Sequence, residues 1–421
     1  MSNSDWPKHK LGALTSRIGD GIHGTPIYVG NSEYSFINGN NLKNGYIQIT
    51  KDTKKVSVSE FQKYFLEFDN NTLFLSINGT LGSLAKYRGE SIILGKSAAY
   101  IQCSTINIDY LYYYLQLDSV QEHLWNVATG STIKNLSLAS IRDLEIPTPS
   151  IEKQSKIAKV LSIIDAKINC NNQIITQLES VAKLLYDYWF MQFDFPDGNG
   201  RPYRSSGGVM VFNKELNCEI PYGWESCVLG DHITFKRGIS YKSSDIQSSG
   251  VPFLNLNSFS LDGEFKPQGT KFFNGKYKND SLINIGDLII AITDVTRNAD
   301  IIGKSFVLGD FFDQKPLISC DVAVVSSEKF GSYYLEQLFN SNQYHSYIKH
   351  FASGTLVLHL DLSGVKWYRS IIPPQNLLGR YESICKAIFK KRSTSLNENI
   401  QLKSLRDWLL PILMNGQVTA S

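Results

Sequence analysis

The chain has 421 residues, which is too long for one ordinary hydrophobic core and predicts two or three domains. Hydrophobic residues make up 42% and charged residues 19%, a globular composition that excludes a mainly disordered chain. The formal net charge of +3 permits nucleic-acid binding without requiring it, because local patches matter more than the total.

Membrane and metal signals are missing from the sequence. No apolar run approaches the eighteen or so residues of a membrane helix, and the segment MSNSDWPKHK has no apolar stretch of the signal-peptide kind, so we expect a cytoplasmic protein. The six cysteines are scattered without a C-x-x-C pair or a nearby histidine. We therefore expect reduced, mostly buried thiols, no metal site and no disulfide framework.

Residues 1–150 predict a β-rich α+β unit. Apolar, strand-like runs separated by Gly, Asn and Asp turns lie at 46–50, 73–77, 84–87 and 98–103. One shorter helix is expected at 109–127. Its tyrosines Tyr112, Tyr113 and Tyr114 are expected to be core or helix-contact residues, in preference to a stacking platform for single strands.

A long helix is expected next, at 151–192. Pro147 and Pro149 close the preceding segment, because proline lacks an N–H and restricts the residue before it, and no proline or glycine follows as far as Phe190. Positions spaced alternately four and three apart form a heptad seam, which needs a partner helix: Ile157, Leu161, Ile164, Ile168, Asn171, Ile175, Leu178, Ala182, Leu185 and Trp189. The polar Asn171 either sets the register of the pair or marks a local opening, and we favour register.

The second half of the chain repeats the first. A connector at 193–222, rich in Gly, Ser, Asn and Pro and with one hairpin at 208–213, separates the halves. Matching segments then occur in the same order: Trp6 with Leu11-Gly12 and Trp224 with Leu229-Gly230, FINGN from Phe36 and FLNLN from Phe253, LFLSINGT from Leu73 and LIIAITDV from Leu288, ATGSTIKNLSL from Ala128 and ASGTLVLHLDL from Ala352. We expect a second β-rich unit at 223–374, with its own short helix at 331–351.

A second long helix is expected at 375–415, before a tail at 416–421. Its seam has apolar ends and a polar middle: Leu377, Tyr381, Ile384 and Ile388, then Lys391, Ser395 and Glu398, then Leu402, Leu405, Leu409 and Ile412. Two such helices are expected to pack as an antiparallel coiled-coil pair, about 60 Å long, that separates the two units. The polar middle, with Asn171 opposite Ser395, is the weakest part of the predicted seam and the place to which the alternative of a local opening applies.

Several longer segments carry a family resemblance. They are the I-P-x-P-x-x-E-x-Q run at 146–154, YWFMQFDFP at 188–196, RPYRSSGG at 201–208, DGIHGTP from Asp20, FINGNN from Phe36 and SLRDWLLPILMNGQV at 404–418. Together they make the chain resemble the specificity (S) subunits of type I restriction-modification systems over its whole length. The second proline motif departs from the first, because Leu378, Gly379 and Arg380 replace Glu152, Lys153 and Gln154.

The resemblance implies an architecture and partners. The β-rich units would be two target recognition domains, each reading half of a split duplex DNA sequence, related by an internal pseudo-twofold repeat and spaced by the paired helices. The conserved regions would dock two methyltransferase (M) subunits and, through them, the restriction and translocase (R) subunits. This chain would bind no cofactor itself, with S-adenosylmethionine, ATP and Mg on the partner subunits.

Catalytic motifs are missing from the sequence. GESIILGKS at 89–97 is a near-match to a phosphate-binding loop, but five residues separate its glycines where four are needed, and an apolar run fills it. There is no Asn/Asp-Pro-Pro-aromatic tetrapeptide, H-E-x-x-H, G-x-S-x-G or nuclease-type carboxylate cluster. We expect a subunit that catalyses nothing by itself.

Candidate DNA-contacting residues are basic, amide and hydroxyl side chains in turn-rich stretches. In the first unit they are Arg17, His23, Thr25, Asn40, Asn41, Lys43, Asn78, Thr80, Ser131 and Lys134; in the second they are Lys236, Arg237, Tyr241, Lys242, Asn255, Asn257, Thr293, Asp294, Thr296, Arg297, Asn298, Thr355 and His359. For each residue a solvated or turn-forming role is at least as probable as base contact, and Asn40 and Asn41 fit a turn. The loops 78–80 and 293–298 are favoured, because they occupy equivalent positions and differ in sequence.

The main hypothesis is a non-catalytic DNA-recognition subunit whose half-sites lie about one helical turn, roughly 34 Å, apart. The alternative is a protein-binding scaffold with two interaction domains on a coiled-coil spacer. An enzyme with its own methyltransferase or nuclease site is disfavoured by the missing motifs.

Overall fold

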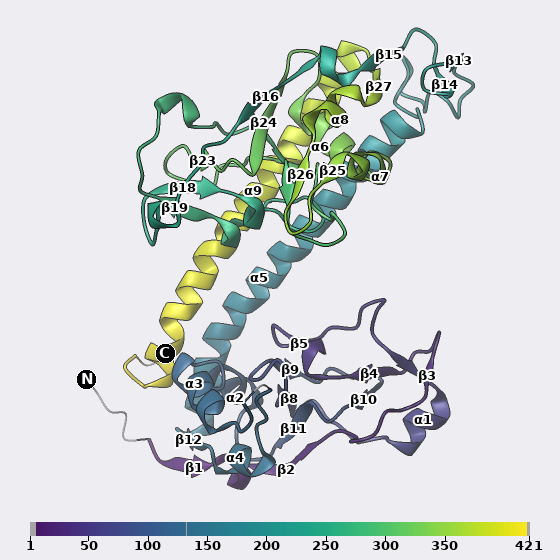
Figure 1. Ribbon diagram of the computed structural model, residues 1–421. Helices are drawn as coiled ribbons and strands as arrows, with labels where there is room; N and C mark the ends of the chain where they lie inside the picture. The colour runs from purple at the N-terminus through teal and green to yellow at the C-terminus, as the bar shows by residue number, and fades with distance from the viewer. Residues whose placement is uncertain (1–5, 132, 419–421) are drawn as a thin grey trace. The chain divides into compact units, whose positions relative to one another are not determined.

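The computed structural model describes residues 6–131 and 133–418 (Figure 1). The chain forms two compact units: unit 1 comprises Met1–Asn169 and Ile400–Ser421, and unit 2 comprises Cys170–Asn399. Within the described residues, no helix combines the length and the apolar character that crossing a membrane requires.

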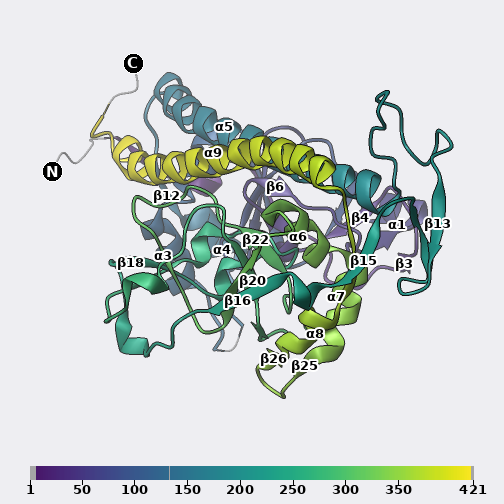
Figure 2. The same ribbon diagram turned by 90° about the horizontal axis from the view of Figure 1, so that it is seen from above.

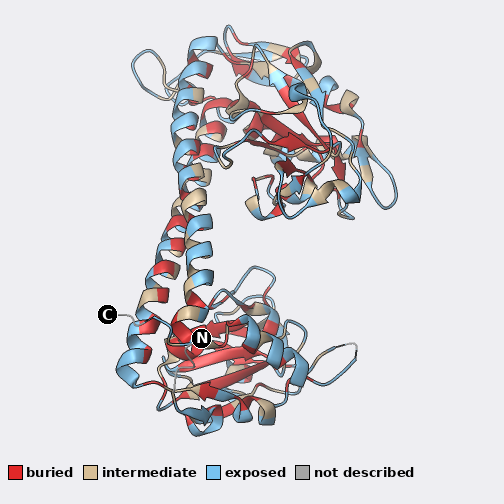
Figure 3. Ribbon diagram, turned by 90° about the vertical axis from the view of Figure 1, so that its left-hand side faces the viewer, coloured by how far each residue is buried: buried red, intermediate tan, exposed pale blue. Residues whose placement is uncertain are grey.

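Unit 1 is built on two four-stranded sheets. One has the strand order β2-β11-β8-β9 and the other β10-β4-β7-β3, and two-stranded pairs β1-β12 and β5-β6 flank them. The strands are β1 (Lys8–Lys10), β2 (Thr15–Asp20), β3 (Tyr28–Val29), β4 (Ser35–Ile37), β5 (Leu42–Lys43), β6 (Tyr46–Ile47), β7 (Lys55–Val56), β8 (Thr72–Ser76), β9 (Leu84–Lys86), β10 (Ile92–Leu94), β11 (Ala98–Cys103) and β12 (Glu145–Pro147). Buried residues follow the strands of these sheets (Figure 3).

Three short helices pack against the first sheet of unit 1: α2 (Ile108–Tyr114), α3 (Asp118–Val127) and α4 (Leu138–Asp143). The helix α1 (Val58–Lys63) packs against the second sheet through Phe61. The single helix expected at 109–127 is thus two, because the backbone of Leu117 is extended and interrupts the helical hydrogen bonding. Tyr112 and Tyr113 are buried in the core, as expected.

Unit 2 repeats this arrangement with more strands. Its four-stranded sheets have the orders β16-β24-β20-β22 and β17-β19-β18-β23, with smaller sheets β15-β27, β13-β14 and β21-β26-β25. The strands are β13 (Met210–Asn213), β14 (Cys218–Pro221), β15 (Glu225–Val228), β16 (Ile233–Arg237), β17 (Ile246–Gln247), β18 (Val251–Leu254), β19 (Lys271–Phe273), β20 (Leu288–Ala291), β21 (Thr293–Asp294), β22 (Ser305–Val307), β23 (Leu317–Ile318), β24 (Val322–Ser327), β25 (Ala352–Ser353), β26 (Leu358–Leu360) and β27 (Arg369–Ile372).

The helices of unit 2 are α6 (Ser332–Asn340), α7 (Asn342–Ile348) and α8 (Leu362–Trp367). The helix expected at 331–351 is divided at Ser341, whose backbone is extended and whose hydroxyl caps α7 by accepting the Tyr344 N–H. The expected connector hairpin pairs Met210–Asn213 with Cys218–Pro221, so it lies further along the chain than 208–213.

Strand pairing confirms the repeat. In unit 1, β10 pairs in parallel with β4, and β11 lies between β2 and β8. In unit 2, β23 pairs in parallel with β18, and β24 lies between β16 and β20. Equivalent strands therefore occupy equivalent places in each unit, and the fold is the predicted α+β class with two similar β-rich units.

Two long helices accompany the units: α5 (Ile151–Tyr186, 36 residues) and α9 (Gln375–Met414, 40 residues). Each passes from one unit into the other, and their segments lie side by side within each unit (Figure 2). In unit 1, Ile157 and Leu161 share a core with Leu410 and Leu413. A helix of one repeat is thus buried against the end of the other repeat, which supplies the partner that the seam required.

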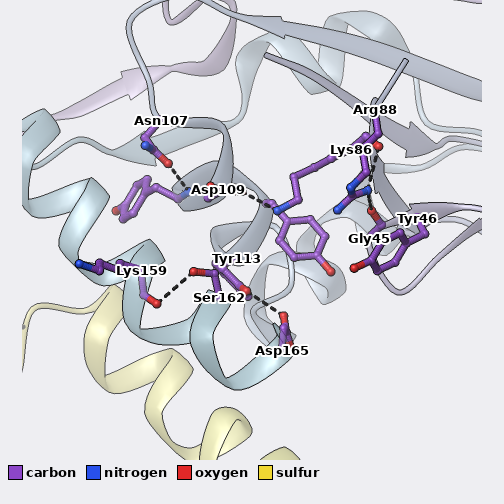
Figure 4. A network of polar contacts seen from close by, with 12 residues as sticks. Gly45, Tyr46, Lys86, Arg88, Asn107, Asp109, Tyr113, Lys159, Ser162 and Asp165 are labelled. Atoms are coloured by element: carbon purple, nitrogen blue, oxygen red, sulfur yellow. Dashed lines mark hydrogen bonds and ion pairs between the residues drawn. The ribbon is translucent and has the colours of Figure 1, made fainter. Parts of the chain in front are cut away.

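Polar contacts join α2 of unit 1 to the long helices (Figure 4). The Tyr113 hydroxyl donates to Asp165 of α5 at 2.7 Å, and Arg406 of α9 donates to the same carboxylate at 2.9 Å. Burial is the largest cause that raises the pKa of Tyr113, so its hydroxyl stays protonated and donates. These three residues fix the position of α2 on the helix segments.

The polar middle of the seam is closed in unit 2. Asn171 donates to Asn399 at 3.0 Å and to Glu398 at 2.9 Å, and Asn399 donates to Asn172 at 2.9 Å. The alternative of a local opening opposite Ser395 does not hold, because Asn171, Ser395 and Asn399 are all buried. Asn171 has defined partners on α9, which supports its role in setting register.

The seam of α9 differs from the predicted one. Ile384 and Leu405 are 42% and 44% exposed, whereas Cys385, Arg392 and Asn399 are buried. Arg392 donates to Glu179 of α5 at 2.6 Å. The face of α9 that meets α5 is therefore partly polar, which a hydrophobic pattern does not show.

Buried carboxyls in unit 2 give a pH prediction. Burial raises the pKa of Glu336 on α6 to about 8, while Arg392 acts in the opposite direction. When the pKa of a carboxyl is higher in the folded state than in the unfolded state, its stabilising contribution is fully present at a pH below the unfolded-state pKa. That contribution is lost as the pH rises through the folded-state pKa. Glu336→Gln is therefore expected to raise the free energy of unfolding at pH 9, by about 1–3 kcal/mol, and to change it little at pH 4.5.

Urea unfolding at the two pH values measures this difference. The Gln carbonyl can still accept the Val307 N–H, which Glu336 accepts at 3.0 Å. Glu328→Gln, at an exposed position, is the matched control. An effect of equal size at both pH values would contradict the prediction.

The structure also places the near-match to a phosphate-binding loop and the six cysteines. The near-match to a phosphate-binding loop contains strand β10, whose residues Ile92, Ile93 and Leu94 are buried. Cys103, Cys227 and Cys385 are free and buried, but Cys170, Cys218 and Cys320 are free and exposed, so the expectation of mostly buried thiols holds for half of them. No group of three or more His, Cys, Asp or Glu among the described residues is placed to hold a metal ion.

Candidate nucleic-acid interface

In unit 1, loops from distant parts of the sequence meet at one end of the sheets. The Ile22 N–H donates to the Leu94 carbonyl, and the Lys96 N–H donates to the Ile22 carbonyl. Ser97 connects the next turn, because its hydroxyl accepts the Gly39 N–H at 2.9 Å. The segment after β2, the turn after β4 and the β10–β11 turn are therefore adjacent.

The loop after β8 joins the same group. The Ile77 N–H donates to the Ser97 carbonyl. Asn78 forms a β-bridge with Asn135, which also pairs with Thr129 to close a hairpin. We call this group loop cluster 1; it consists of residues 21–26, 38–43, 77–82, 95–97, 128–131 and 133–135.

Unit 2 has the same contacts at equivalent positions. Ile239 donates to the Ile318 carbonyl and accepts from the Cys320 N–H, while the Ile292 N–H donates to the Asp321 carbonyl. Thr293 pairs with His359 across β21 and β26. We call this group loop cluster 2; it consists of residues 238–242, 255–258, 293–298, 319–321 and 352–360.

A shared glycine permits both clusters to close. A Cβ on Gly21 would lie 2.0 Å from the Leu94 carbonyl oxygen, and one on Gly238 would lie 2.3 Å from the Ile318 carbonyl oxygen. Only glycine fits these positions, since a side chain would displace the neighbouring backbone. The Gly-Ile pair was missed by sequence reasoning, although it is visible as DGI and RGI in the two halves.

Most predicted contact residues lie on the surface of their unit. The exposed ones are Arg17, His23, Thr25, Asn40, Lys43, Thr80, Ser131, Lys236, Arg237, Lys242, Asn257, Arg297, Asn298, Thr355 and His359; the partly buried ones are Asn41, Asn78, Lys134, Tyr241 and Thr296. Arg17, Lys236 and Arg237 lie on β2 and β16, beside the clusters. Most of the remaining residues lie in the clusters themselves.

Three predicted contact residues are inside the fold: Asn255, Thr293 and Asp294. The Asp294 carboxylate accepts the N–H groups of Thr296, Ile301 and Ile302 at 2.6–2.9 Å, so it holds the 293–298 loop. These side chains shape the loops and are not available to a ligand in this structure, so we leave them out of the proposed contacts.

Two further side chains have local roles. Asn41 accepts the Asn38 N–H at 2.9 Å and donates to the Gln48 carbonyl at 3.1 Å, which is the turn-holding role considered above. Behind the 293–298 loop, burial lowers the pKa of His345 to about 4, so its ring is neutral at pH 7 and adds no positive charge to loop cluster 2.

One basic residue of loop cluster 1 was missed. Lys96 is exposed in the β10–β11 turn, beside Ile22. In the sequence it belongs to the near-match GESIILGKS, which was discounted as a phosphate-binding loop. Only the pairing of β10 with β4 brings it beside the other loops.

Comparison with known proteins places the chain among relatives of one kind. Residues 27–180 match the family model described as "Type I restriction modification DNA specificity domain". The chain is 26% identical to the type I restriction enzyme MjaIX specificity subunit of Methanocaldococcus jannaschii, over 98% of this chain and 94% of that protein. The chain is a relative of the type I specificity subunits. The resemblance predicted from the sequence is confirmed.

Two further comparisons extend this result. The HindI specificity subunit of Haemophilus influenzae is 22% identical over 74% of this chain and 77% of that protein. The crystal structure of a type I restriction-modification S subunit from M. genitalium matches with a TM-score of 0.62 at 17% identity, over 98% of this chain and 97% of that one. The structural match supports the specificity-subunit fold over the whole chain.

Proposed function

We propose that this chain is the DNA sequence-recognition subunit of a type I restriction-modification complex. The observation that carries the proposal is the pair of loop clusters, which stand at equivalent places on equivalent scaffolds and present different side chains. Two readers of unlike sequence imply a bipartite, asymmetric duplex target. Each cluster would enter the major groove of one half-site, where base edges present distinct donor and acceptor patterns.

The partners follow from the family. Two M subunits and, through them, R subunits would assemble on this chain, and S-adenosylmethionine, ATP and Mg would be bound by those partners. The subunit itself would catalyse nothing and would act in the cytoplasm, where its duplex target lies. The helices α5 and α9 would fix the non-contacted spacer between the half-sites.

Selection from random duplex pools by the chain in complex with its methyltransferase partner tests the proposal. A bipartite sequence is expected to be enriched, and affinity is expected to fall steeply as salt rises, because phosphate contacts release counterions. Binding of a protein ligand by the units without any enrichment of duplex DNA would favour the scaffold alternative.

A single lysine tests the phosphate contacts. Lys43 is exposed in loop cluster 1, and Lys43→Ala is expected to lower the salt dependence of log K by about 0.9 while leaving the selected sequence unchanged. Fluorescence anisotropy at several salt concentrations measures the slope. Lys8→Ala, at an exposed position on β1 outside the cluster, is the control, and an equal change in both variants would contradict the assignment.

A further inference from the structure

Each of the two loop clusters contains a hairpin, and the two hairpins are of the same kind. In unit 1 it pairs Thr129 with Asn135, and in unit 2 it pairs Ser353 with His359. Each hairpin begins with a glycine in the left-handed region, Gly130 at φ 103° and Gly354 at φ 134°. The chain therefore builds the same local structure twice, beside loops that differ.

The glycines are required by close packing inside the hairpin. A Cβ on Gly130 would lie 2.3 Å from the Ile133 carbonyl oxygen, and one on Gly354 would lie 2.1 Å from the Val357 carbonyl oxygen. The matching clashes place Gly130 and Gly354 in the same relation to the residue three positions later, so the described side chains of the two hairpins can be compared position by position.

That comparison divides each hairpin into two parts. The tip carries a hydroxyl and a β-branched apolar residue in both units: Ser131 and Ile133, or Thr355 and Val357. The following pair differs in chemistry: Lys134-Asn135, or Leu358-His359. Ile133 is 61% and Val357 is 39% exposed, so the apolar tips face solvent without a cover.

The following pair lies directly against the loops that are expected to read bases. Asn135 forms a β-bridge with Asn78, and His359 pairs with Thr293 across β21 and β26. The exposed member of each pair is an amide, Asn135, in unit 1 and an imidazole, His359, in unit 2, and these two groups offer different hydrogen-bond patterns. The two pairs are therefore suited to different base pairs, whereas the tips are suited to the same surroundings.

We propose that, in each unit, the hairpin tip grips the DNA independently of its sequence and that the following pair determines the half-site. The hydroxyl of the tip would donate to a phosphate, and the β-branched side chain would pack on the sugar or enter a base step. This rests on the proposed function, because it assigns parts of the same DNA-binding site. It identifies Asn135 and His359 as specificity-determining residues, because both are exposed, whereas Lys134 donates to the Ala128 carbonyl at 3.3 Å and Leu358 packs against the core.

Exchange between the two hairpins gives the sharpest test, because each substitution already exists at the equivalent position in the other unit. In the complex with the methyltransferase partner, Ser131→Thr with Ile133→Val is expected to leave both affinity and selected sequence unchanged. Asn135→His is expected to change the bases selected in one half-site only. No change of bases in the second variant, or a change in the first, would overturn the division.

A third variant tests the grip itself. Ser131→Ala with Ile133→Ser is expected to weaken binding to specific and unrelated duplexes by the same factor, about tenfold, and to leave the selected bases unchanged. Val58→Ser, at an apolar position on α1 that is 51% exposed, is the control and is expected to bind like the unmodified chain. Unequal losses for the two kinds of duplex would overturn the proposal.

Two other results separate the possible failures. Loss of the methyltransferase subunit from the purified complex of the third variant, with unchanged DNA affinity in the complex that remains, would make the tip a protein-docking surface and overturn the proposal. Failure of the unmodified complex to select any bipartite sequence would instead refute the proposed function on which it rests.

Discussion

Replacing residues 1–150 with the corresponding segment of a relative that reads another target is expected to change one half of the recognised DNA sequence completely and to leave the other half intact. The reason is that loop cluster 1 is formed entirely by residues of this segment, from the turn after β2 to the hairpin at 129–135. Loop cluster 2 draws all its residues from unit 2. No side chain is shared between the readers.

The graft must preserve the attachment of α2 to the helices. Tyr113 donates to Asp165, which also accepts from Arg406, and the last two residues belong to α5 and α9, outside the segment. A donor with phenylalanine at the Tyr113 position would leave Asp165 with one donor fewer. Mapping of methylated adenines in a host that expresses the hybrid complex measures the result. A change in both half-sites would contradict the division of labour.

The repeat and the first long helix could be predicted because their signals are periodic or repeated. The seam of α5 is apolar at nearly every position, and no proline or glycine interrupts it, so local pattern and tertiary packing agree. The match of LFLSINGT with LIIAITDV also located β8 and β20, the central strands of equivalent sheets.

The second long helix shows where this reasoning fails. Its face toward α5 includes Arg392 and Asn399, which are buried with partners on α5, Glu179 and Asn172. A search for apolar positions instead chose Ile384 and Leu405, which face solvent. Burial of a paired polar group depends on its partner, and a single segment of sequence does not contain that information.

The candidate site has the same limit. Asp294 was chosen because it lies in the favoured 293–298 loop, yet it accepts three backbone N–H groups inside the fold. Lys96 was overlooked because its neighbour in space, Ile22, is far away in sequence. Residue type could therefore indicate the kind of surface, but the strand pairing decides which residues belong to it.

Lengthening both long helices by one heptad is expected to change the spacer of the DNA target and to leave both half-site sequences unchanged. The insertions belong after Asn169 in α5 and after Asn399 in α9, where the chain passes from one unit to the other. At these points neither unit loses a residue, and the Asn171–Asn399 contact remains within unit 2. Seven residues are close to two helical turns, so the seam keeps its orientation.

The size of the expected change follows from helix and duplex geometry. Seven residues add about 10.5 Å of helix, and base pairs are spaced by about 3.4 Å, so the spacer is expected to grow by about three base pairs. Three base pairs also rotate the duplex by about 100°, which the inserted heptad does not match, so the affinity for the new target is expected to be lower than for the original one.

Methylation mapping of the lengthened complex reports the spacer, and insertion into α5 alone is the matched control. Insertion into one helix adds length to only one of the two, so the α5–α9 contacts on the two sides of the insertion, Asp165 with Arg406 and Asn171 with Asn399, cannot both be kept. Because buried polar groups then lose their partners, the variant is expected to lose stability and DNA binding together. Two half-sites at the original spacing in the doubly lengthened chain would show that α5 and α9 do not set the distance, because the added length would then have had no effect on the target.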